Sequence, residues 1–264
     1  MSEARTRAVM VMVVAAVLAV SVAACCEEGS GVMARETRPV GVWNRLSLDV
    51  PGSVRVVQGP ATPLRIETDD NLMDRVVTRV RDGELEIGTD DDCCVDPTRL
   101  VVDVSAEEIR GLALDGSGAI VLPKPIDGDS VELSLDGSGS IEVAMIRAGD
   151  VSIDIDGSGQ VDVVVDADRL RTSIDGSGDT LVAGSAGEHD ISIDGSGDVE
   201  ATSLETGSTR IEIDGSGGCA IAADQQLDVT IDGSGDVAYC GDPRVTQSID
   251  GSGSVHQASA SSCD

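Results

Sequence analysis

Residues 191–199 read Ile-Ser-Ile-Asp-Gly-Ser-Gly-Asp-Val, and the tetrapeptide Asp-Gly-Ser-Gly within them occurs eight times in the chain. The eight copies begin at Asp115, Asp136, Asp156, Asp175, Asp194, Asp214, Asp232 and Asp250. Successive copies are 18 to 21 residues apart. A short motif at such regular spacing indicates one structural unit stacked on copies of itself, so we expect a solenoid rather than a globule with one central core.

The residues around each tetrapeptide alternate between apolar and polar side chains, which is the two-residue period of a β-strand. In the copy at Asp194, the residues one and three places before the Asp are Ile193 and Ile191, and those five and seven places after it are Val199 and Ala201. We expect these four columns to point inward in every copy. Each unit of about 20 residues should then hold two main strands joined by the Asp-Gly-Ser-Gly turn, which predicts an all-β fold, a parallel β-helix.

The composition of the tetrapeptide suggests how the turn is held. Both glycines can adopt positive φ without a Cβ penalty, and the Asp carboxylate can accept backbone N–H groups two residues on. Stacking in register would place the eight carboxylates along one edge, about 4.8 Å apart, where they repel each other. We favour capping of the turn N–H groups as the compensating interaction. The alternative is that Ca²⁺ bridges adjacent carboxylates.

The two ends of the chain depart from the regular pattern. We assign irregular opening coils to residues 40–110, regular repeats to 111–255 and a tail to 256–264. The segment from Asp69 to Val80 is predicted to be a short helix or a loop over the upper end. Gln247 and Gln257 occupy columns that are apolar in nearly all other copies, so we interpret the last coil as a cap.

The first 24 residues have the pattern of an export signal. Arg5 and Arg7 precede an uncharged apolar run at 8–24, which ends in Val-Ala-Ala before Cys25. This ending resembles the bacterial lipobox, so we predict a lipoprotein signal peptide at 1–24, a lipid-modified Cys25 and a flexible tether at 25–39. Cleavage as an ordinary signal peptide after Ala23 or Ala24 is one alternative. Retention of the 17-residue apolar run as a membrane anchor is another.

The chain is strongly acidic, with 18 Lys and Arg against 48 Asp and Glu and a formal net charge of −30. Such a surface repels nucleic acid, which excludes that class of partner. It is equally unsuited to lying flat on an anionic membrane, so we expect the membrane to be contacted only through the lipid.

Seven cysteines in an exported chain permit disulfides. Cys219 lies in an inward column and is expected to be a buried free thiol, whereas Cys240 and Cys263 form the favoured disulfide pair. Cys93 and Cys94 lie in the acidic loop 90–96 and could bridge elsewhere. A metal site in that loop is weakly supported because it lacks the usual two-residue separation and a nearby His.

Catalysis has little support in the sequence. His189 and His256 are the only near-neutral bases, and we expect both to be exposed at coil edges. Ser117 and its seven counterparts do not fit the Gly-x-Ser-x-Gly pattern of a nucleophile elbow. Eight near-identical turns offer no singular site, so we predict that the protein is not an enzyme.

Several further stretches carry a family resemblance: 42–50, 52–59, 70–72, 82–87, and the Ile-Asp-Gly-Ser-Gly-Asp-Val copies at 193–199 and 231–237. From Val42 to Val255 the chain resembles the bacterial head GIN domain family, described as "putative auto-transporter adhesin". The resemblance implies an exported β-helical domain without catalytic residues to carry over.

We therefore predict a lipid-anchored protein facing outside the cytoplasm, a structural or interaction scaffold of the adhesin type that binds an envelope or extracellular ligand. The alternative is a surface protein that uses the stacked Asp edge to bind Ca²⁺ or a polysaccharide.

Overall fold

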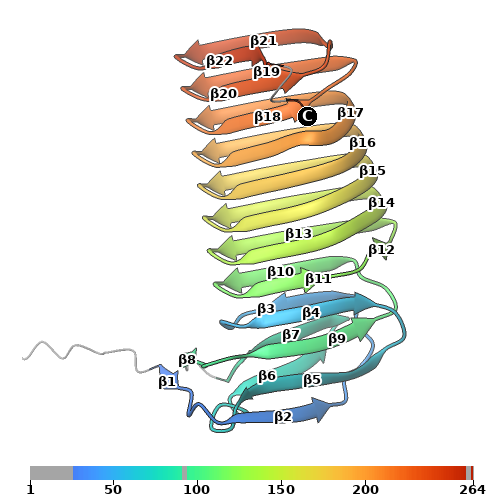
Figure 1. Cartoon of the computed structure of the whole chain (residues 1–264), viewed down its shortest axis with the longest axis vertical. Coiled ribbons are helices and arrows are strands. Elements are labelled where there is room, and N and C mark those ends of the chain that lie inside the picture. Colours follow the sequence, from blue (N-terminus) through green and yellow to red (C-terminus); the bar gives the residue numbers. More distant parts are fainter. Residues whose placement is uncertain (1–25, 91–93, 260–262, 264) are drawn as a thin grey trace, which may run out of the picture.

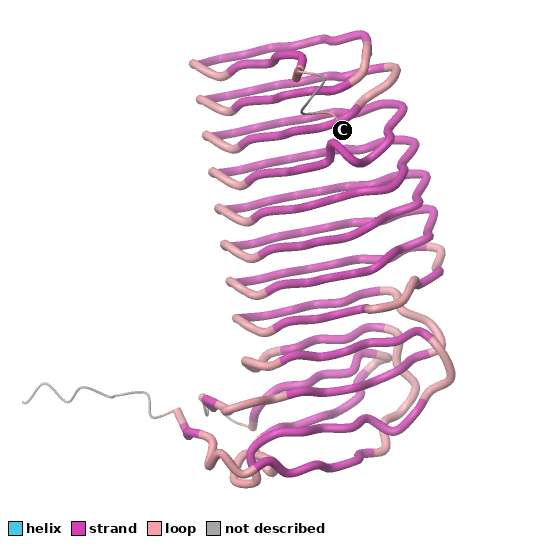
Figure 2. Tube along the Cα trace, in the orientation of Figure 1, coloured by secondary structure: helices cyan, strands magenta, loops and turns pink. Residues whose placement is uncertain are grey.

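Parallel strands stack along nearly the whole chain and build an elongated rod (Figures 1 and 2). The structure is a computed structural model that describes residues 26–90, 94–259 and 263. These residues form strands, turns and loops without a helix, so the predicted all-β solenoid is confirmed. No helical segment suited to crossing a bilayer occurs among them. The predicted signal peptide and Cys25 lie outside the described residues.

The regular part of the rod is made of coils in which two strands meet at each Asp-Gly-Ser-Gly turn. Its strands are β10 (Gly111–Gly116), β11 (Ala119–Leu122), β12 (Ile126–Asp127), β13 (Ser130–Gly137), β14 (Ser140–Gly157), β15 (Gln160–Gly176), β16 (Asp179–Gly195), β17 (Asp198–Gly215), β18 (Gly218–Ala222), β19 (Gln226–Gly233), β20 (Asp236–Cys240), β21 (Arg244–Gly251) and β22 (Ser254–Gln257). The pairings between coils are parallel and keep each tetrapeptide above the previous one. In β14 and β15, for example, Ile155 pairs with Ile174 and Asp156 with Asp175.

The predicted inward columns form the core. Ile155, Ile174 and Ile193 are each no more than 2% exposed, and the other columns are buried in the same way until the last coil, except for the half-buried Tyr239. A further inward column, beyond the four predicted, lies five residues before the Asp. It contains Val131, Val151, Leu170, His189, Thr209 and Leu227.

The two glycines of the turn have different roles, which corrects the expectation that both use positive φ. The first glycine has positive φ in all eight copies, 127° at Gly195 for example. The second glycine is needed for close approach between coils. A Cβ at Gly197 would lie 2.5 Å from the carbonyl oxygen of Gly178 and 2.7 Å from Ile174 Cγ2.

The lower end of the rod, called the base here (residues 26–110), has a different topology. Its strands are β1 (Glu27–Glu28), β2 (Met33–Arg38), β3 (Arg45–Leu48), β4 (Ser53–Gln58), β5 (Thr62–Asp69), β6 (Val76–Arg81), β7 (Glu84–Thr89), β8 (Val95–Asp96) and β9 (Val101–Ala106). β3 and β4 continue the parallel stack below β10 and β11. β5 pairs antiparallel with both β2 and β9, and β2 is the outermost strand of the base in Figure 1.

The segment from Asp69 to Val80 forms a turn followed by β6, so the short-helix alternative is wrong and the loop alternative holds only up to Arg75. β6 pairs antiparallel with β7 around Asp82 and Gly83, whose φ values are 49° and 84°. Positive φ at both central residues fits a tight β-hairpin, which offers the chain a better local structure than a helix.

The prediction of a flexible tether at residues 25–39 is wrong for most of that segment. Residues 33–38 form β2, and Glu27 and Glu28 pair with Val95 and Asp96 of β8. A disulfide joins Cys26 to Cys94. Long-range pairing of this kind leaves no periodic signal in the sequence, which is why the segment looked unstructured.

The last coil differs from those before it. Gln247, Ile249 and Gln257 are exposed at positions that are buried in most other coils. Polar side chains at the end of the stack are consistent with the predicted cap.

The structure also contains the disulfide between Cys240 and Cys263 that the sequence favours, and Cys219 is a buried free thiol, as expected.

Candidate functional site

The eight Asp carboxylates of the tetrapeptides do stack in one column, but they do not cap their turns. Each Asp is paired in register with the next, and all are exposed. The turn N–H groups donate to the coil below instead: Ser138 N to the Gly116 oxygen at 2.9 Å and Ser140 N to the Gly118 oxygen at 3.1 Å. Among the described residues, none makes a hydrogen bond or ion pair with these carboxylates. The capping prediction is therefore wrong.

The Asp column continues into the base through Asp49. Partial burial, and then the negative charge of Asp115, raise the pKa of the Asp49 carboxyl above its ordinary value. Asp49 and Asp115 are thus close enough for their charges to interact.

A metal centre finds no support in the described parts of the chain, where no cluster of three or more His, Cys, Asp or Glu side chains is arranged to hold an ion. Cys94 of the acidic loop is used in the disulfide with Cys26. Asp91, Asp92 and Cys93 of that loop lie outside the described residues.

His189 is buried inside the solenoid, which corrects the expectation that it is exposed. Its side chain is 1% exposed, and its Nε2 lies 3.0 Å from Oγ1 of Thr172. Burial lowers the pKa of His189 to about 3, so the ring is neutral and shielded from ligands at the surface. His256 is exposed, as predicted.

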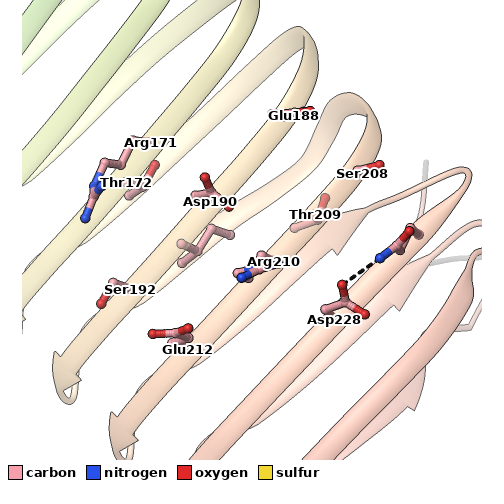
Figure 3. Close-up of a pocket in the computed structure, with 12 residues that line it drawn as sticks. Arg171, Thr172, Glu188, Asp190, Ser192, Ser208, Thr209, Arg210, Glu212 and Asp228 are labelled. Carbon is pink, nitrogen blue, oxygen red and sulfur yellow. Dashed lines mark hydrogen bonds between the residues drawn. The ribbon is translucent and has the colours of Figure 1, made fainter.

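A polar groove of about 560 Å³ lies on the outer face of the rod (Figure 3). It crosses four neighbouring strands, β15, β16, β17 and β19. Four charged side chains face the groove from the same position of successive strands, each paired with the next in the ladder: Arg171, Asp190, Arg210 and Asp228. Its other polar side chains include Glu188, Ser192, Ser208, Glu212 and Gln226.

The two guanidiniums of the groove are available to a ligand. Although Arg171 and Arg210 each stand beside Asp190 in the ladder, neither makes an ion pair or hydrogen bond within residues 26–90, 94–259 and 263. Arg169, two residues before Arg171 in β15, is by contrast paired with Asp150 at 2.6 Å. The two coils that carry Arg171 and Arg210 are about 10 Å apart, since one coil lies between them.

This arrangement provides hydrogen-bond donors and acceptors. Guanidiniums donate hydrogen bonds in a fixed fork, and the carboxylates and hydroxyls of the groove accept them. No His faces the groove, since His189 lies behind it in the core. The groove therefore offers several hydrogen-bonding side chains side by side. Sequence reasoning missed it because its residues share a position in the coil but not a residue type.

Comparison with solved structures finds the same fold in bacterial proteins. The chain is similar to a "Putative lipid binding protein" from Parabacteroides distasonis, with a TM-score of 0.85 and 26% identity over 88% of this chain and 99% of that one. A "putative adhesin" from Parabacteroides merdae has a TM-score of 0.83 and 24% identity over 88% of this chain and 98% of that one. A "putative adhesin" from P. distasonis has a TM-score of 0.84 and 24% identity over 89% of this chain and 100% of that one. The curated proteins contain no similar sequence.

The family comparison agrees with the resemblance noted in the sequence. The profile described as "Putative auto-transporter adhesin, head GIN domain" matches residues 43–161 and 144–243, which together cover the base from Trp43 and nearly all the regular coils. The chain therefore belongs to the head GIN domain family.

Proposed function

We propose that this protein is an exported, lipid-anchored binding scaffold of the adhesin type, which holds a polar ligand on the face of its rod without converting it. The observation that carries the proposal is the groove across β15, β16, β17 and β19, with the unpaired guanidiniums of Arg171 and Arg210. Membership of the adhesin-like family supports the same class of function.

The scaffold suits binding because its strands are held rigidly. The backbone ladder between β15, β16 and β17 fixes the spacing of the side chains in the groove. A site on paired strands keeps its geometry better than a site on loops. A ligand that spans several coils is therefore met by an array of preorganised donors and acceptors.

The chemistry of the groove favours a polymer rich in hydroxyl groups. Guanidiniums, carboxylates, hydroxyls and an amide alternate over four strands, and Ile191 is the one apolar side chain among them. A polysaccharide laid along the rod could hydrogen-bond to successive coils. The groove, rather than the Asp column, is thus our proposed place for such a ligand.

Lipid anchoring is the second part of the proposal. It is supported by the Val-Ala-Ala sequence before Cys25. Expression of the full-length chain with a labelled fatty acid, followed by mass spectrometry of the N-terminal peptide, should find lipid on Cys25. A Cys25→Ser variant should lose both the label and its membrane association, and an unlabelled wild type would contradict the anchoring.

The groove is tested by binding of the folded chain to immobilised hyaluronan, dextran and collagen, which sample acidic, neutral and protein polymers. We expect binding to one of the polysaccharides that falls at least tenfold in Arg171→Ala/Arg210→Ala. Arg147→Ala is the matched control, because Arg147 is an exposed arginine paired with Asp127 outside the groove. Equal binding by both variants would place the ligand elsewhere, and cleavage of the polymer would contradict a purely binding role.

A further inference from the structure

The N-terminal segment is fixed to the base without slack. Cys26 is joined to Cys94, and the Glu27 N–H donates to the Cys94 oxygen at 2.9 Å. Cys25 directly precedes Cys26 in the sequence. A lipid on Cys25 would therefore be attached one peptide bond away from the folded body.

Further contacts continue this fixation for several residues. The buried carboxylate of Asp69 accepts hydrogen bonds from Gly31 N at 2.7 Å and Thr98 N at 2.8 Å. Burial opposes ionisation of Asp69, yet these N–H groups hold the pKa of its carboxyl below the ordinary value. Asn71 Nδ2 donates to the Glu28 oxygen, and Arg75 is paired with Glu27 at 2.8 Å. The segment up to Gly31 is thus bound to the base at several points.

Two exposed apolar side chains follow directly after this segment. Val32 is 58% exposed and Met33 is 39% exposed. They stand at the start of β2, the outermost strand of the base, and β1, the first strand of the chain, lies at the same end of the rod (Figure 1). The other large exposed apolar residues of the described chain are Val42, Leu181 and Ile249. Val32 and Met33 are the adjacent pair among them.

The charge of the chain is unevenly distributed between the base and the coils. Residues 26–110 contain ten arginines and 18 acidic residues, whereas residues 111–264 contain six basic and 29 acidic residues. Most base arginines are paired with a nearby carboxylate, as Arg35 and Arg99 are with Glu67. An anionic lipid surface repels the coils more strongly than the base. Since this repulsion is screened within about 8 Å, a rod standing on its base keeps most of the Asp column beyond its range.

We propose that the base of the rod rests directly on the lipid surface, with Val32 and Met33 in contact with it, and that the Cys26–Cys94 disulfide fixes the rod end-on. The proposal rests on the lipid anchoring of Cys25 proposed above. In this arrangement the protein itself contacts the membrane, in addition to the lipid on Cys25. The attachment is rigid, whereas the sequence predicted a flexible tether. The ligand-binding coils then project away from the membrane.

Energy transfer to the membrane can measure this orientation, because Trp43 is the only tryptophan and lies buried in the base. The full lipidated chain is reconstituted into phosphatidylcholine vesicles that carry a dansyl-labelled lipid. We expect at least fivefold more efficient transfer from Trp43 than from the distal tryptophan of a Trp43→Phe/Tyr239→Trp variant. Equal transfer from the two positions would overturn the end-on orientation.

Three variants test the contacts themselves. Eight Gly and Ser residues inserted between Cys25 and Cys26, or the substitutions Val32→Ser/Met33→Ser, should each lower the transfer from Trp43 at least twofold. Leu181→Ser is the matched control, since Leu181 is also an exposed apolar residue (41%) but lies in the coils. Unchanged transfer in the first two variants would overturn the rigid contact.

Two controls separate the possible failures. Mass spectrometry of the N-terminal peptide shows whether Cys25 is lipidated in each sample. A lipidated chain without preferential transfer from Trp43 overturns the present inference alone, whereas a chain without lipid overturns the proposed anchoring. Light scattering gives the oligomeric state of the wild type and of the Val32→Ser/Met33→Ser variant. A wild-type dimer that becomes a monomer in the variant would mean that these side chains contact a second copy of the chain, which would overturn the lipid contact.

Discussion

Nε2 of His189 lies 3.0 Å from Oγ1 of Thr172 in the preceding coil, inside the solenoid. Burial lowers the pKa of His189 to about 3, whereas the ordinary value is 6.5. Between these two pH values the unfolded chain binds a proton that the folded chain does not. The contribution of His189 to stability is therefore intact above pH 6.5 and is lost as the pH falls below it.

We expect this single group to lower the free energy of unfolding by about 1.4 kcal/mol per pH unit as the pH falls below 6.5. Urea unfolding between pH 7.5 and 5 measures the slope before most carboxylates titrate. The double variant His189→Leu/Thr172→Val should flatten it, because Leu already occupies the same column at Leu170 and Val leaves no unpaired hydroxyl. An unchanged slope in this variant would assign the pH dependence to other groups.

His189 also shows where the sequence pattern could have been extended. The columns nearest the turn were predictable because they repeat Ile, Leu or Val, as at Ile155 and Ile174. Continuing the same alternation by one strand period would have placed His189 inside. Mixed composition in that column, with Thr209 beside His189, hid the signal.

Other features could not be read from the local pattern. The disulfide between Cys26 and Cys94 joins residues 68 positions apart, in segments without repeats. That pairing depends on which distant segments meet, which the local pattern does not contain. The groove was hidden for another reason: Arg171, Asp190 and Arg210 each lie four residues before a tetrapeptide, but no shared residue type marks the position.

The second glycine of each turn should be intolerant to any side chain. A Cβ at Gly197 would approach the Gly178 oxygen to 2.5 Å, and the rigid ladder on both sides prevents relaxation. We expect Gly197→Ala to lower the free energy of unfolding by about 1–3 kcal/mol. Gly59→Ala is the control, because a Cβ at Gly59 has no neighbour within 4 Å. Equal urea midpoints for the two variants would show that the coils can separate at little cost.

Neutralising part of the Asp column should stabilise the rod. The carboxylates of Asp156, Asp175 and Asp194 are exposed and stacked in register, with repulsion of about 1 kcal/mol or less for each neighbouring pair. We expect the triple Asn variant to melt at a higher temperature than the wild type at low salt, and the difference to shrink at 0.5 M salt. A loss of stability in the triple variant would instead indicate that the carboxylates support their turns.

Calcium should have little effect on the same column. The described residues provide no cluster of ligands for a metal, and each exposed carboxylate can remain hydrated. Melting in 5 mM CaCl₂ and in EGTA should therefore give transition temperatures within about 2 °C of each other. A large rise in calcium would revive the bridging hypothesis, since an ion that binds the folded state must stabilise it.

The two disulfides should contribute differently to the stability of the rod. Cys26–Cys94 spans 68 residues and Cys240–Cys263 spans 23, so the chain-entropy relation gives about 4 and about 3 kcal/mol for their removal. Cys240 belongs to the stack near its exposed end, whereas Cys26 secures the segment that covers Asp69. We therefore expect Cys26→Ser/Cys94→Ser to expose the first ten residues of the base to limited proteolysis while the coils stay resistant. Cys240→Ser/Cys263→Ser should leave the base intact and shorten the resistant core only at its C-terminal end. Cleavage throughout the coils in the first variant would mean that the base and the coils unfold as one cooperative unit.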